Sequence, residues 1–90
     1  MSVEKILAER ETTHGDFSKT AEISQDFKRV LVKHGEGKLT NVQAESLGVI
    51  CHKIARILNG NPNHKDHWDD IAGYATLASK EIDKKQEKTA

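Results

Sequence analysis

The sequence predicts an all-α protein: a short N-terminal helix followed by a three-helix antiparallel bundle, which assembles into an oligomer. The segments between the breaks in the chain are long and rich in Ala, Leu, Glu and Lys, which favours helices over strands. Their apolar residues recur every three or four positions, as on one side of a helix. A chain of 90 residues buries only about 60–65% of its unfolded surface, so we expect pairing with further copies as a dimer or larger assembly.

The first two helices are expected at Ser2–Arg10 and Asp16–His34. Ser2 is suited to the N-cap of the first helix. In the break between the two helices, Gly15 turns the chain and Asp16 caps the second helix. The apolar stripe of the second helix comprises Ile23, Phe27, Val30 and Leu31.

The last two helices are expected at Thr40–Asn59 and Asp66–Lys84, with Thr40 as a cap and Gly60 as a stop. The short turn around Pro62 makes them an antiparallel hairpin, across which the second helix packs. Their expected core residues are Leu47, Ile50, Cys51, Ile54, Ile57 and Leu58 on one helix and Trp68, Ile71, Ala72, Ala75, Ala78 and Ile82 on the other. We expect one helical domain over residues 1–83 and a frayed or disordered tail over residues 84–90.

The charge and hydropathy of the chain disfavour some classes of binding partner. Fourteen basic residues balance fourteen acidic ones, whereas a general grip on DNA, RNA or an anionic membrane needs a net basic surface. The chain has neither the apolar core of a signal peptide at its start nor an apolar run long enough to span a membrane, so we expect a cytoplasmic protein. The single cysteine, Cys51, lies in an apolar run and is expected to be a small buried side chain.

Two helices carry a second face that is neither wholly polar nor wholly apolar. On the third helix this face comprises Glu45, Val49, His52 and Arg56, and on the fourth it comprises Asp66, Asp70, Tyr74 and Leu77. Gly73 would let a backbone or a ligand approach the fourth helix closely. Ordinary surface charge, a subunit interface and a small-ligand site between facing helices all fit this pattern.

Two polar segments have both a structural and a functional interpretation. Asp66 and Asp70 are one helical turn apart and suit Mg²⁺ with a phosphate completing its ligands, or they stabilise the helix start through its dipole. A zinc site at His64 and His67 is disfavoured because no cysteine pair supports it. The segment around His14 either caps the second helix or contacts a phosphate at the helix N-terminus.

Three stretches resemble a family of small uncharacterised phage and prophage proteins. They are His14–Phe17, Val49–Leu58 and His67–Ala75, within a likeness that covers roughly residues 9–80. The resemblance implies a phage-encoded protein in the host cell cytoplasm.

A more distant likeness is to the phage nucleotide-modification-associated domain and to MazG-like all-α nucleoside triphosphate pyrophosphatases. The residues that carry it are Lys53, Arg56, Asp70, Tyr74 and Ala75. In MazG-like enzymes, two acidic pairs on consecutive helices hold Mg²⁺ against the triphosphate, and the metal activates water. Where that pattern has two neighbouring glutamates, this chain has Glu45 followed by basic residues, which favours nucleotide binding over hydrolysis.

The resemblance therefore predicts a helical protein that binds a nucleotide or nucleotide-like phosphate, as a minimal or degenerate MazG-like pyrophosphohydrolase. Lys53 and Arg56 would hold the phosphate. Tyr74 or Phe17 would stack on the base, and His14 and Phe17 would close the site.

In the hydrolytic version of this function, Asp66 and Asp70 hold Mg²⁺ and Glu45 orients water. The alternative is a non-catalytic interaction protein that binds and modulates a host factor through the second faces of the last two helices. A structural dimer without a ligand is the third hypothesis.

Overall fold

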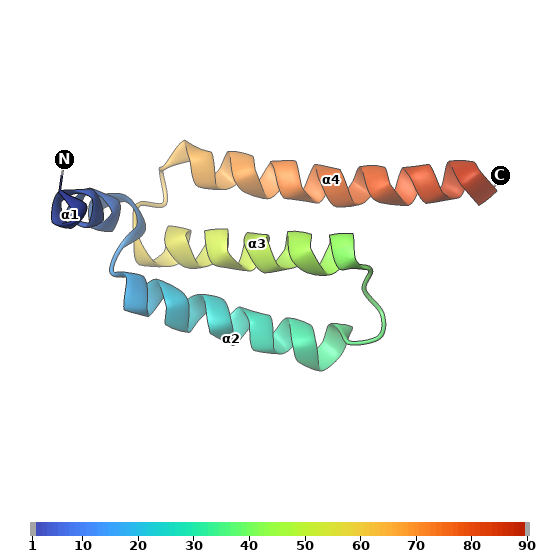
Figure 1. Cartoon of the computed structure of the whole chain (residues 1–90), viewed down its shortest axis with the longest axis horizontal. Helices are drawn as coiled ribbons and strands as arrows, with labels where there is room; N and C mark the ends of the chain where they lie inside the picture. Colours follow the sequence, from blue (N-terminus) through green and yellow to red (C-terminus); the bar gives the residue numbers. More distant parts are fainter. Residues whose placement is uncertain (1, 90) are drawn as a thin grey trace.

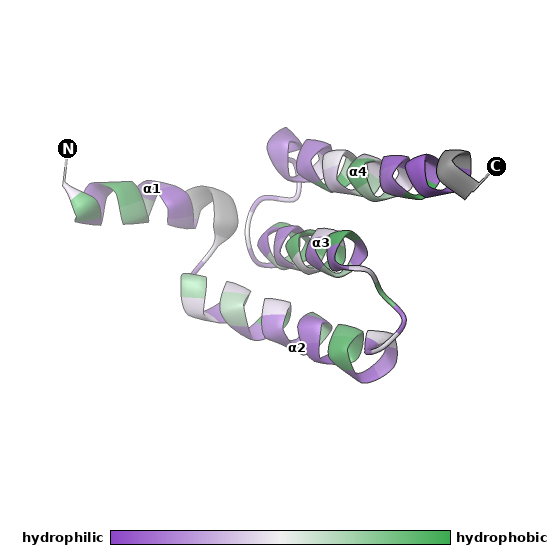
Figure 2. Cartoon of the chain, turned by 45° about the vertical axis from the view of Figure 1, so that its right-hand side comes forward, coloured by the Kyte–Doolittle hydropathy of each residue, from purple (hydrophilic) through white to green (hydrophobic). Residues whose placement is uncertain are grey.

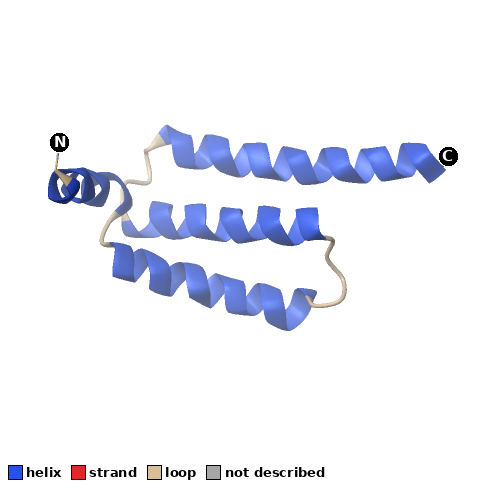
Figure 3. Ribbon diagram, in the orientation of Figure 1, coloured by secondary structure: helices blue, strands red, loops and turns tan. Residues whose placement is uncertain are grey.

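Four helices make up the fold. The computed structural model describes the backbone of residues 2–89 and the side chains of residues 2–11 and 15–86. The helices are α1 (Val3–His14), α2 (Phe17–Gly35), α3 (Asn41–Asn59) and α4 (Lys65–Thr89), and no strand occurs in the described range (Figures 1 and 3). The predicted all-α class is confirmed. Within residues 2–89, no helix combines the length and the apolar character needed to cross a membrane.

Local side-chain chemistry sets several helix ends as expected. The Ser2 hydroxyl accepts a hydrogen bond from the Lys5 amide at 3.2 Å. Thr40 and Gln43 form a reciprocal capping box, with hydrogen bonds of 3.1 and 3.0 Å. The Gly60 amide donates to the Arg56 carbonyl and closes α3.

Two helices are longer than expected. α1 continues past Arg10 to His14, because threonines lower helix propensity without stopping a helix. It ends where Gly15 takes a positive φ of 79°. α4 passes Lys84 and continues to Thr89, so helical backbone extends into the expected tail.

The three long helices form a single layer with α3 in the middle, rather than the expected bundle (Figures 1 and 2). In the described chain, α2 and α4 each pack on α3 and make no contact with each other, while α1 projects from one end of the layer. The reason is that α3 presents two different sides. Gly48 and Asn59 face α2, whereas Lys53, about 140° around the helix, faces α4.

The layer buries few apolar side chains. Among the described residues, the buried hydrophobic ones are Ala55 and Cys51, the latter as expected. The buried polar residues are Thr20, Ser24, Ser46 and His67. In this structure the buried residues are small ones or histidine, and the described large apolar side chains are either half-buried or exposed, in about equal numbers.

The expected core of the last two helices is therefore wrong in part. Trp68, Ala72, Ala75 and Ile82 on α4 and Leu47 and Leu58 on α3 are exposed. At the start of α4 the buried side chain is His67, while the Trp68 indole lies over the loop and donates to the Pro62 carbonyl at 2.8 Å. The physical reason is that a single layer of helices has nothing to cover the apolar side of α3 and α4.

Hydrogen bonds from Asn59 fix the start of α2 against the end of α3, and we call this contact the joint between α2 and α3. The Asn59 amide donates to the Asp16 carbonyl at 2.8 Å and to the Thr20 hydroxyl at 3.1 Å. A Cβ on Gly15 would overlap the Asn59 carbonyl. Asp16 occupies the N-cap position of α2, where the Ser18 hydroxyl donates to its carboxylate and lowers its pKa.

Candidate anion-binding site

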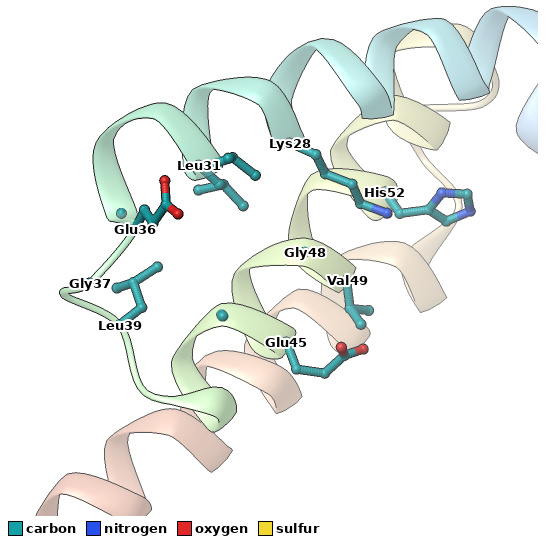
Figure 4. A pocket seen from close by; sticks show the side chains of 12 residues that line it. Lys28, Leu31, Glu36, Gly37, Leu39, Glu45, Gly48, Val49 and His52 are labelled. Atoms are coloured by element: carbon teal, nitrogen blue, oxygen red, sulfur yellow. The ribbon is translucent and has the colours of Figure 1, made fainter.

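The mixed face of α3 borders two hollows of the surface, and Glu45 lines both of them. The larger hollow, of about 660 Å³, lies between α2 and α3 (Figure 4). The smaller, of about 310 Å³, lies between α3 and α4. Glu45, Val49 and His52, three of the four residues predicted for this face, line the larger hollow.

The larger hollow is apolar along its walls and charged at its ends. Its apolar side chains are Leu31, Val32, Leu39, Ala44 and Val49, and its polar ones are Lys28, Glu36, Glu45 and His52. In Figure 4, Lys28 reaches from α2 across to α3 beside His52, while Glu36 lies near the turn that joins the two helices. A volume of this size is within the usual range for a small-molecule site.

Positive charge gathers around His52. Burial, the largest cause, and then the positive charges of Arg56, Lys28 and Lys53 lower the pKa of its imidazole. A Cβ on Gly48 would lie 3.9 Å from Lys28 Cε, an ordinary van der Waals distance, so Lys28 passes over α3 at this residue. Three cationic side chains from two helices thus act on one imidazole, and of the three only Lys28 lines the larger hollow with it.

The structure brings together one predicted pair of site residues. Lys53 Nζ lies 2.8 Å from the Asp70 carboxylate, and the lysine side chain is only 16% exposed. The hydrogen bond from Lys53 is the largest cause that lowers the pKa of Asp70. Lys53 is therefore held by a carboxylate, which leaves Lys28 and Arg56 as the cations better placed to receive an anion.

The acidic residues at the start of α4 each lie beside a basic group. Asp69 pairs with Lys65 at 2.7 Å, and Asp66 lies 3.8 Å from His64 Nε2 with its side chain 81% exposed. Within the described part of the chain, no three His, Cys, Asp or Glu side chains lie close enough together to hold a metal ion. The Mg²⁺ site at Asp66 and Asp70 stays a prediction.

The remaining predicted residues lie in different places. Tyr74 lines the smaller hollow with Glu45, and Leu77 lies beside it. Phe17 is 71% exposed at the first position of α2, and the His14 side chain lies outside the described residues. No part of the described chain closely approaches the Cβ position of Gly73.

Lys28 and Glu36 are the site residues that sequence reasoning missed. Both belong to α2 or to the turn after it, whereas the prediction compared faces of α3 and α4 only. The available signal was the pair Lys28 and Val32, one helical turn apart on the side of α2 away from Val30.

The fold and the site together define a small all-α protein with a hollow between two helices of a layer, lined by Lys28 and His52 as well as by Glu36 and Glu45. The chain belongs to the DUF6378 family, a domain of unknown function, whose family model matches residues 2–82. No curated protein matches the chain, and no solved structure does.

Proposed function

We propose that this protein binds a nucleotide or a similar phosphorylated small molecule in the larger hollow, between α2 and α3. The observation that supports the proposal is that Lys28 and His52 line the larger hollow, while the positive charges of Arg56 and Lys53, which do not line it, also act on His52. Lysine and arginine are the side chains that bind phosphate most directly. The apolar walls suit the flat face of a base or another apolar group.

Within this proposal each end of the hollow has a separate role. Lys28 and Arg56 hold the phosphate, because Lys53 already pairs with Asp70. Glu36 and Glu45, the carboxylates of the hollow, accept hydrogen bonds from hydroxyl or amino groups of the ligand. Tyr74, across Glu45 in the smaller hollow, lies outside this binding mode.

The proposal stops at binding. Hydrolysis of the MazG-like kind would place Mg²⁺ on Asp66 and Asp70, and Asp70 would first have to leave Lys53. Direct binding by cationic side chains needs no such rearrangement, so we expect affinity for the ligand both with and without Mg²⁺.

The test is thermal unfolding of the protein against inorganic phosphate and a panel of nucleoside mono-, di- and triphosphates, each with and without Mg²⁺. A ligand at 100 times its dissociation constant adds about 2.7 kcal/mol to the free energy of unfolding. We expect a rise of the unfolding midpoint with at least one nucleotide. No rise with any member of the panel contradicts the proposal.

Charge-removing variants localise the binding. Lys28→Gln and Arg56→Gln each remove a charged hydrogen-bond donor, which corresponds to roughly a tenfold or greater loss of affinity. The matched control is Lys33→Gln, an exposed lysine of the same helix that does not line the hollow. An equal loss in all three variants would indicate general attraction of an anion to positive charge.

A further inference from the structure

The side of the layer opposite the two hollows carries an uncovered apolar face. On α3, Leu47 and Leu58 lie about 200° and 220° around the helix from Glu45, which borders both hollows. On α4, Trp68 lies about 180° from Leu77, which lines the smaller hollow. By the same geometry, Val30 of α2 lies about 200° from Lys28 of the larger hollow.

We define the apolar face by six large side chains, two from each long helix. Their exposed fractions are 37% for Phe27, 56% for Val30, 36% for Leu47, 64% for Leu58, 53% for Trp68 and 41% for Ile82. Exposure of six large apolar side chains on one side of three packed helices is typical of an interaction surface.

The accessible surface and the radius of gyration of the chain are both larger than those of a compact monomer of the same size. The accessible surface is 6642 Å² for a mass of 10.0 kDa, whereas a compact monomer of that mass exposes about 5,200 Å². The radius of gyration is 15.7 Å, against about 12 Å for a compact domain of this length. The excess of about 1,400 Å², to which the projecting α1 also contributes, falls in the range that one subunit of a stable homodimer buries.

We propose that the apolar face is covered by the same face of a second copy of this chain, in a twofold symmetric dimer. Such a pairing needs a surface that complements itself. The arcs of α3 and α4 on this side carry leucine, isoleucine, alanine and tryptophan side chains and no charged one, so these two helices meet their copies without repulsion between like charges. The same arc of α2 carries Lys19, Asp26 and Lys33 beside Val30.

The polar group of the Trp68 side chain is already hydrogen-bonded within one chain. Its indole nitrogen donates to the Pro62 carbonyl at 2.8 Å within the same chain. The ring can therefore enter an apolar interface without leaving a buried donor unsatisfied. Because Trp68 is the one tryptophan of the sequence, its fluorescence reports on this face alone.

The first test is sedimentation equilibrium of the full chain over a wide concentration range, with tryptophan emission recorded on the same samples. We expect a mass twice that of the 10.0 kDa chain and a blue-shifted emission that moves to the red as dilution dissociates the dimer. A 10.0 kDa species with water-exposed tryptophan at every concentration overturns the proposal, and then a different protein is the occupant to seek.

Two matched variants locate the interface. Leu58→Glu places a charge on the apolar face and should weaken association by on the order of 30-fold or more. Leu77→Glu makes the same change at a similarly exposed leucine on the opposite side, 57% exposed, and should leave association unchanged. If Leu58→Glu fails to fold, dilution of the parent protein still decides between dimer and monomer. Dissociation by Leu77→Glu, with Leu58→Glu still dimeric, overturns the proposed face.

Discussion

The imidazole of His67 is 1% exposed and lies in the contact between α3 and α4. Burial is the largest cause that lowers its pKa below the ordinary 6.5, and the positive charges of His64, Lys53 and Arg56 lower it further. Asp70 acts in the opposite direction. The protein therefore prefers this residue neutral, which couples its stability to pH.

The sign of the coupling follows from which state binds more protons. Between the lowered pKa of folded His67 and 6.5, the unfolded chain binds a proton that the folded chain does not. The free energy of unfolding should therefore rise as pH increases through this window, and this contribution is lost as pH falls through the folded pKa. We expect His67→Gln to reduce the slope of the unfolding free energy against pH in the range below pH 6.5, measured by urea unfolding.

His52 provides the comparison, because burial and nearby cations lower its pKa too. His52→Gln should also reduce the slope of the unfolding free energy against pH. The double variant should have a smaller slope than either single variant. A slope that is unchanged in His67→Gln would mean that this buried imidazole does not titrate in the window.

Single residues also show what a sequence can and cannot predict about a site. Lys53 and Asp70 were both candidates, and they meet at 2.8 Å. Asp66 was chosen with Asp70 because they are one turn apart, yet it lies beside His64 instead. Spacing along one helix predicts a shared face, but the partner of each side chain depends on the neighbouring helix, which the spacing does not specify.

At the scale of elements, the joint between α2 and α3 depends on a glycine. Gly15 has a φ of 79° and a ψ of −175°, a combination open almost only to glycine. A Cβ there would overlap the Asn59 carbonyl, and Asn59 is the residue that ties α3 to the start of α2.

Gly15→Ala should therefore be much more destabilising than an ordinary glycine substitution. Gly37, in the turn between α2 and α3, is the matched control because its φ is 81° and nothing lies within 4 Å of its Cβ position. Gly37→Ala should cost about 1 kcal/mol from backbone strain alone. Gly15→Ala should cost a further 1–3 kcal/mol, roughly, from steric overlap. Equal losses in urea unfolding of the two variants would show that the joint is not tightly packed.

The elements were predicted well where local chemistry decides them. The capping box of Thr40 and the closing hydrogen bond of Gly60 lie where the sequence placed the ends of α3. The end of α1 was missed because the polar run before Gly15 continues the helix. Lys28 and Glu36 were missed because the larger hollow needs the relative position of two helices, and no local signal gives it.

At the scale of the whole molecule, periodicity identified the apolar stripes but not what covers them. The stripe on α4 was assigned to a core, yet Trp68 and Ile82 are 53% and 41% exposed. A stripe predicts only that one side of a helix avoids water. Whether the same chain or another copy covers that side depends on how the helices are arranged, and here they form a layer.

A layer one helix thick has two faces that share no side chain, so changes on the two faces should act independently. Glu45 borders the hollows and Leu47 belongs to the apolar face, about 200° around the same helix. In a double-mutant cycle at one fixed protein concentration, Glu45→Gln and Leu47→Ala should change the free energy of unfolding additively within about 0.5 kcal/mol. The matched cycle is Lys53→Gln with Asp70→Asn, which share an ion pair across α3 and α4 and should be clearly non-additive. Strong coupling between Glu45 and Leu47 would mean that a change on one face alters the packing of the other, as in a closed bundle rather than a layer.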